Sequence, residues 1–166
     1  ISKSLILCKE STGKCNQSVG DHKTKNFTYI RIDSLCTGRL CREQTRLTML
    51  QISLLSRMAI VFPFLADLAH GELKVYVRTK DPEFFLIVAQ QRPHTVYLPG
   101  KDSAAGRRVR SIEEPLIKET FQTGKPARGK REWNYGSMVD MFTFGIHDGD
   151  KVIGVLNFEV VLDKLS

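Results

Sequence analysis

The sequence predicts an α+β domain, in which an antiparallel sheet of about five or six strands packs against flanking helices. Apolar residues recur with helical spacing up to about residue 70, whereas shorter strand-like runs follow it. A hairpin pattern closes the chain, because an Asp148-Gly149 turn separates two apolar runs that extend over residues 141–160. Strands and helices do not alternate regularly, so a doubly wound parallel sheet is not expected.

The first helix is expected over residues 43–70. Apolar side chains recur there at spacings of three and four, the period of one helix face: Leu47, Leu50, Leu54, Met58, Val61, Leu65 and Leu68. Further apolar residues widen this stripe, which is typical of a helix that buries two faces. Pro63 should kink or divide the helix, because proline lacks a backbone donor and clashes with the preceding turn. Gly71 should end it.

Three strands are expected next. Residues 73–78 alternate apolar and polar side chains, which predicts a strand buried on one face. Residues 84–89 are continuously apolar, which predicts a central strand covered on both faces. Residues 94–98 form the third, short candidate, and residues 99–110 read as a loop.

A second helix should span residues 112–122. Ser111 and Glu114 have the spacing of a capping box, and Pro115 falls in the first turn, where its missing donor matters least. Gly124 is expected to end the helix. A strand near residues 130–135 and the final hairpin complete the predicted sheet.

The basic charge of the chain is concentrated near its beginning. The 166 residues carry a formal charge of +7. Residues 1–48 hold nine Lys/Arg and four Asp/Glu, whereas residues 49–166 hold sixteen and fourteen. Residues 1–42 also lack a sustained apolar period, so we expect a poorly ordered extension there and one domain over residues 43–166.

All four cysteines lie in the predicted extension. They are Cys8, Cys15, Cys36 and Cys41. Zinc sites favour pairs separated by two to four residues, and only the last two cysteines approach that spacing. The alternatives are a zinc site and incidental cysteines; we predict no metal site.

No catalytic constellation stands out. The four histidines form no metal-binding pair, and His70 and His147 read as a helix end and a turn. Glu113 and Glu114 fall in the first turn of a predicted helix, where the dipole stabilises carboxylates without any catalytic role. Catalytic residues and cofactors are therefore not predicted.

Two basic clusters remain. Arg107, Arg108 and Arg110 lie in a predicted loop. The second cluster, on a predicted strand next to Trp133 and Tyr135, consists of Arg128, Lys130 and Arg131. Such clusters can bind phosphates or single-stranded nucleic acid, although a solvated charged face is the simpler interpretation.

Six segments resemble the N-terminal sensor domain of a group of bacterial sensor histidine kinases. They are residues 65–68, 85–90, 92–95, 113–116, 124–126 and 152–156. Their order and spacing extend the resemblance over about residues 47–160. The resemblance implies a GAF- or PAS-type sensory fold that precedes a PAS module and a kinase core.

The resemblance also implies a ligand pocket between the sheet and the 112–122 helix. Trp133 and Tyr135 would share one face of a strand, and Arg92 and His94 share a parity after the central strand. We predict these four residues as ligand-binding residues. The alternative is that Trp133 packs in the core.

We therefore predict a non-catalytic, cytoplasmic input domain of a two-component sensor histidine kinase, which binds a small molecule or relays the state of a partner. The alternatives are a GAF-like enzyme and a basic nucleic-acid-binding module. No secretory signal or membrane span is expected from the sequence. The wide apolar arc predicts a parallel homodimer through the 43–62 helix.

Overall fold

The computed structural model describes residues 34–95, 103–132 and 138–161. Six strands form one antiparallel sheet in the order β3-β2-β1-β6-β5-β4. The strands are β1 (Gly71–Arg78), β2 (Phe84–Gln91), β3 (Arg108–Arg110), β4 (Ala127–Glu132), β5 (Met138–Asp148) and β6 (Lys151–Val161). The helices are α1 (Ser34–Gln44), α2 (Met49–Met58), the 3-10 turn η1 (Ala59–Val61), α3 (Phe62–Ala69) and α4 (Pro115–Thr123). The predicted α+β antiparallel architecture is confirmed.

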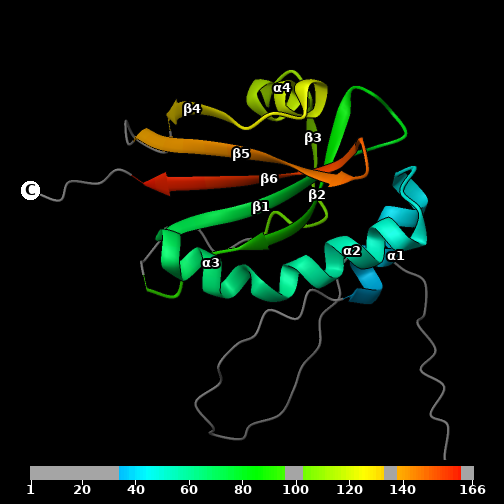
Figure 1. The fold of residues 1–166 in the computed structure, drawn as a ribbon, viewed down its shortest axis with the longest axis horizontal. Coiled ribbons are helices and arrows are strands. Elements are labelled where there is room, and N and C mark those ends of the chain that lie inside the picture. Colours follow the sequence, from blue (N-terminus) through cyan, green and yellow to red (C-terminus); the bar gives the residue numbers. More distant parts are fainter. Residues whose placement is uncertain (1–33, 96–102, 133–137, 162–166) are drawn as a thin grey trace, which may run out of the picture.

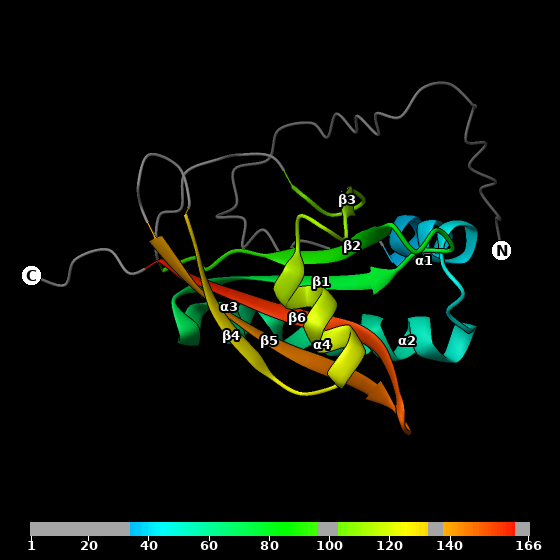
Figure 2. The same ribbon diagram turned by 90° about the horizontal axis from the view of Figure 1, so that it is seen from above.

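Helices cover both faces of the sheet. Helices α1, α2 and α3 lie on one face, and α4 lies on the other (Figures 1 and 2). The core under α1–α3 consists of Cys41, Ile52, Leu55, Ala59, Phe62, Ala66, Leu73, Val75, Val77, Leu86, Val88, Ala89, Ile146 and Ile153. The core under α4 consists of Tyr76, Phe85, Ile87, Ala104, Ile117, Phe121 and Val155.

The predicted first helix is divided, as Pro63 suggested. Helix α2 begins after Thr48, whose side chain accepts from the Gln51 amide while the Gln51 side chain accepts from the Thr48 amide. A 3-10 turn separates α2 from α3, and Pro63 lies in the first turn of α3. His70, with φ 50°, ends α3 in the left-handed conformation, so Gly71 already belongs to β1.

The predicted domain boundary at residue 42 differs from the structure. Helix α1 begins at Ser34, and Cys41 is buried in the core. Its sequence carries too few apolar residues to show a helical period, which explains why it read as part of the extension. Residues 1–33 of the extension predicted over residues 1–42 lie outside the described residues.

The stretch Met49–Ala69 has the length and apolar composition of a membrane-spanning helix, although the sequence led us to expect none. In this fold 33% of its apolar window is buried. Ile52, Leu55, Phe62 and Ala66 pack against the sheet. Core helices of folded domains satisfy the same test of length and composition.

The strands differ from the sequence expectations in two places. Strand β1 is buried on both faces instead of one, because α4 covers the side that carries Tyr76. The chain bends at His94 and Thr95 where a third strand was expected, and residues 96–98 lie outside the described part. A short strand, β3, instead forms within the segment that read as a loop.

Proline and glycine residues mark the ends of α4 and the turn of the final hairpin. Pro115 opens α4 and Gly124, with φ 69°, ends it, but Glu114 is the N-cap and makes no capping hydrogen bond. The predicted Ser111 capping box is therefore wrong. In the hairpin Asp148 pairs with Lys151, which leaves Gly149-Asp150 as the loop.

A cluster of buried charges lies on the α4 side of the sheet. Arg131 contacts Glu114 at 3.1 Å and Glu159 at 2.9 Å. Lys74 contacts Glu159 at 2.8 Å and Glu72 at 3.0 Å. The cluster therefore joins β4, the start of α4, β6 and β1 through alternating charges.

The carboxylates of this cluster have opposite pKa shifts. Burial raises the pKa of Glu72, but the charge of Lys74 and hydrogen bonds from Arg92 and Gln90 outweigh it, so the pKa is lowered. Burial raises the pKa of Glu114 above its ordinary value, and Arg131 offsets only part of that effect. Glu72 is therefore the member whose ionised form the fold favours.

Truncating Ile117 should destabilise the α4 side of the domain. Its side chain is fully buried, so Ile117→Ala should lower the free energy of unfolding by about 2–5 kcal/mol. Urea unfolding measures the loss. Ile112→Ala is the control at an exposed position and should change stability by less than about 0.5 kcal/mol. Equal losses for both variants would contradict this packing.

Glu72→Gln should remove stability that depends on pH. A lowered folded-state pKa means that Glu72 stabilises the fold above its unfolded pKa, and that this contribution is lost as pH falls through the folded pKa. At pH 7 the variant should lose about 2 kcal/mol, and the difference should shrink below about pH 4. Unfolding curves between pH 3 and 7 measure this, with the exposed Glu119→Gln as control. A difference that stays constant with pH would contradict the assignment.

Candidate functional site

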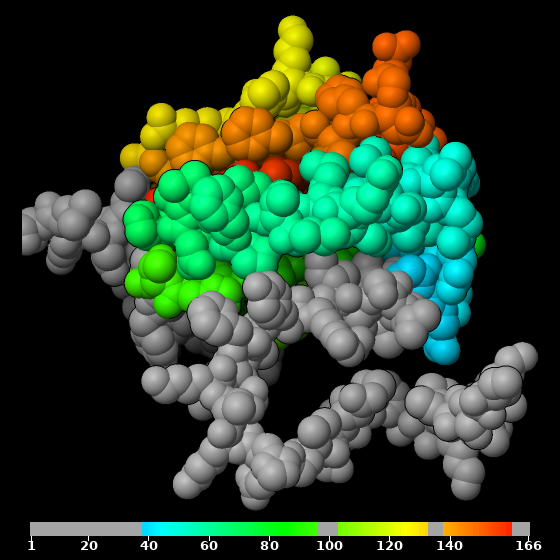
Figure 3. Space-filling view, turned by 60° about the horizontal axis from the view of Figure 1, so that its bottom comes forward, coloured from blue at the N-terminus to red at the C-terminus, as the bar shows by residue number. Residues whose placement is uncertain are grey.

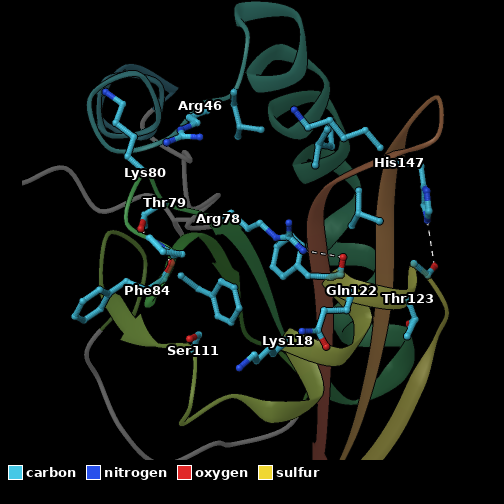
Figure 4. Close-up of a pocket in the computed structure, with 18 of the residues that line it drawn as sticks. Arg46, Arg78, Thr79, Lys80, Phe84, Ser111, Lys118, Gln122, Thr123 and His147 are labelled. Carbon is cyan, nitrogen blue, oxygen red and sulfur yellow. Dashed lines mark hydrogen bonds between the residues drawn. The ribbon is translucent and has the colours of Figure 1, made fainter.

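A groove opens at one end of the sheet. Strand β1 pairs antiparallel with β6, with Tyr76 opposite Val155, so the β1–β2 and β5–β6 turns lie at the same end. The α1–α2 link and the last turns of α4 close the space around them (Figure 4). The groove has a volume of about 970 Å³.

The groove is strongly basic. Its lining contains five lysines and arginines: Arg46, Arg78, Lys80, Lys118 and Lys151. Asp150 is the only acidic residue in this lining, which consists of described residues, so the formal charge is five minus one, or +4. Figure 4 shows Arg46, Arg78 and Lys118 reaching the opening from three separate elements.

These cations have no carboxylate partners within the part of the chain that the structure describes. Elsewhere the pattern differs, since Arg108 pairs with Asp81 and Arg128 with Asp140. Within the described ranges, charge in the groove is thus concentrated without carboxylate partners, whereas about half of the basic residues elsewhere form ion pairs.

Two basic side chains of the groove region are fixed by backbone carbonyls at the end of α4. Arg78 donates to the Phe121 carbonyl at 2.9 Å and its guanidinium lies 4.9 Å from the centre of the Phe121 ring. The His147 Nε2 lies 3.2 Å from the Gly124 carbonyl. Cationic or polar side chains therefore lie against the partial negative charge at this helix end.

Aromatic rings form the apolar part of the lining. Phe85 and Phe121 are stacked with their centres 5.1 Å apart, and Phe84 also lines the groove. Hydroxyl and amide groups from Ser111 and Gln122 border the same space (Figure 4). The groove thus combines positive charge, an apolar wall and hydrogen-bonding groups.

The groove is joined to α2 by one side chain. Gln51, buried in the first turn of α2, donates from Nε2 to Asp148 at 2.8 Å. Its Oε1 accepts from the Thr48 amide at 3.0 Å. Because Arg46 and Leu47 precede this turn and line the groove, the start of α2 is held by the groove's own walls.

Of the four predicted ligand-binding residues, the structure describes only Arg92 and His94. Arg92 contacts Glu72 at 2.8 Å in the buried charge cluster. The His94 amide donates to Asp67 on α3 and lowers the pKa of that carboxyl, so His94 lies on the opposite side of the sheet. Trp133 and Tyr135 lie outside the described residues. Their ligand-binding role stays a prediction, and neither Arg92 nor His94 lines the groove.

The sequence analysis missed the groove residues because they are scattered along the chain, from Arg46 to Lys151. The basic clusters that it singled out do not line the groove: Arg108 sits over the ring of Phe84 at the border of the groove, and Arg131 is held in the buried charge cluster. One signal was available, since Arg78, Lys80 and Lys151 all flank predicted turns. Among the described residues, no group of His, Cys, Asp or Glu could hold a metal ion.

Comparison with known proteins identifies the family. Residues 38–164 match the model of the GAF domain of the histidine kinase PdtaS. Among curated proteins, none matches the chain.

Two solved structures are similar. The sensor region of a sensor histidine kinase is 26% identical with a TM-score of 0.61, and the match covers 78% of this chain and 43% of that one. An IcIR transcriptional regulator from Alicyclobacillus acidocaldarius is 13% identical over 67% of this chain and 58% of that one, with a TM-score of 0.45, which is too low to carry an argument.

The family model and the first structure agree with the antiparallel sheet and its flanking helices. They support a sensory input domain and do not favour the enzyme or nucleic-acid alternatives. The matching region spans less than half of the sensor-region structure. The chain belongs to the family of GAF domains found in the histidine kinase PdtaS.

Proposed function

We propose that this domain is the non-catalytic, cytoplasmic input module of a two-component sensor histidine kinase, and that it relays occupancy of the basic groove through α2 and α3 to PAS and kinase modules. The observation that carries the proposal is the Gln51–Asp148 hydrogen bond, which joins the groove to the start of α2. The family match supports the sensory role.

The proposed relay rests on segments that line the groove and also contact or lead into the start of α2. Arg46 and Leu47 line the groove and lead directly into the Thr48 cap of α2. The β5–β6 turn supplies Lys151 to the groove and Asp148 to Gln51. A ligand that draws these walls together therefore changes the position of the first turn of α2.

The outward side of α2 and α3 is rich in exposed apolar residues, although Ser53 and Arg57 of α2 are also exposed. Figure 3 shows this helical layer lying across the face of the domain. Its exposed large apolar residues are Met49, Leu50, Ile60, Val61, Phe64 and Leu68. Contiguous exposed apolar surface of this kind marks association sites, which supports a homodimer through this face.

The proposed dimer face differs in detail from the sequence expectation. Leu50 is 84% exposed and points outward, but Leu54 is partly buried and packs against the core. The apolar face also continues beyond residue 62 to Leu68. A parallel arrangement would place the same helix ends of two protomers side by side and so deliver both signals in one direction.

Introducing charge at the centre of this face should produce a folded monomer. Ile60→Glu changes a side chain that is 76% exposed, so the fold should persist while the apolar contact is lost. Sedimentation at high micromolar concentration measures the state. Ile112→Glu is the matched control, because Ile112 is 78% exposed and lies just before α4. A wild-type monomer, or a monomer for both variants, would refute this interface.

Breaking the link between groove and helix should loosen the start of α2. Gln51→Leu removes both side-chain hydrogen bonds, so amide hydrogen exchange in the first turn of α2 should accelerate about fivefold. Gln122→Leu is the control, because Gln122 borders the groove from α4 and no hydrogen bond joins its side chain to α2 among the described residues. Unchanged exchange in Gln51→Leu would remove the proposed relay.

A further inference from the structure

We infer that the basic groove binds a small anionic ligand that carries two or more phosphate groups. The inference deepens the proposed function, and it depends on that function only for the signalling consequence of binding. Three features carry it: the uncompensated charge, the arrangement of the cations on separate elements, and the hydrogen-bonding groups between them.

The charge of the groove sets the charge of its ligand. Five basic side chains and one acidic side chain give +4, without carboxylate partners among the described residues for the five cations. Like charges gathered in one concave site repel one another and attract anions. A terminal phosphate group carries about −1.5 to −2 at pH 7, so two such groups match the lining.

The positions of the cations set the shape of the ligand. Arg46 comes from the α1–α2 link, Lys118 from α4 and Lys151 from the β5–β6 turn. Because these cations come from separate walls of the groove, a ligand with linked anionic groups can contact several of them at once. Arg78 is already held by the Phe121 carbonyl and ring, so its orientation is fixed before binding.

The lining favours phosphate oxygens. The Ser111 hydroxyl and the Gln122 amide face the groove in Figure 4, and both can donate to an anion. The end of α4, which would otherwise repel an anion, has its Phe121 carbonyl occupied by Arg78 and its Gly124 carbonyl beside His147. Phe84 supplies an apolar surface beside these charges.

Tripolyphosphate is the direct probe. Titration calorimetry of the 166-residue chain at 0.15 M salt should give one site per domain. The double variant Lys118→Gln/Lys151→Gln should bind at least tenfold more weakly, because it removes two groove cations. The matched control Arg107→Gln/Lys130→Gln removes the same charge at exposed positions outside the groove and should stay within twofold of the wild type. Thermal melts verify that both variants fold.

Two further probes identify the ligand chemistry. Citrate carries three carboxylates and should bind at least tenfold more weakly than tripolyphosphate; equal binding would overturn the phosphate assignment. A single-stranded oligonucleotide should bind no more tightly than tripolyphosphate. Tighter oligonucleotide binding, with equal losses in both double variants, would replace the small ligand by a nucleic acid.

Absence of tripolyphosphate binding at one site, or equal weakening in the groove and control variants, overturns the inference. Either result leaves the oligomeric state of Ile60→Glu and the hydrogen exchange of Gln51→Leu unaffected. Conversely, intact tripolyphosphate binding with unchanged exchange in Gln51→Leu would retain the site and reject the relay.

Discussion

The antiparallel pairing of β1 with β6 is the constraint on which the rest of this domain depends. It joins the first and last strands along the chain at the middle of the sheet, with Gly71 opposite Val160. There is little room at this point, because a Cβ on Gly71 would lie 2.8 Å from the Glu159 carbonyl oxygen. The pairing places β1 at the centre, where α3 covers one face and α4 the other, and it brings the two turns of the groove to one end of the sheet.

Charged side chains are paired in the buried cluster on the α4 side of the sheet, but the cations of the groove have no carboxylate partners in the part of the chain that the structure describes. On the α4 side, Lys74 and Arg131 are enclosed by carboxylates, so that almost every buried charge has an opposite neighbour. Such a cluster favours one arrangement of β1, β4, β6 and α4, because each misplaced element would leave a buried charge unpaired. In the groove, by contrast, the five cations have no carboxylate partner among the described residues. The paired cluster thus stabilises the fold, whereas the cations of the groove remain without carboxylate partners within the described ranges. This arrangement is the one expected of a site that binds an anionic ligand.

Neighbouring residues of α2 face three different parts of the domain: the core, the β5–β6 turn and the outer surface. Ile52 and Leu55 fill the core, Gln51 reaches the β5–β6 turn, and Leu50 faces outward. These roles fall on adjacent residues because successive helical side chains point in different directions. Within two turns of α2, neighbouring residues therefore contact the β5–β6 turn, the core and the outer face.

Local sequence patterns determined most of the secondary structure and the fold class of this protein. Gly149, Gly124 and Pro63 fixed the hairpin turn, the end of α4 and the break between α2 and α3, because each acts through its own backbone geometry. Only the tertiary structure decided which strand faces are covered, that α1 joins the core through Cys41, and that Arg46, Arg78, Lys118 and Lys151 surround one groove. Burial and charge density depend on residues that are far apart in the chain, and the pairing of β1 with β6 brings them together.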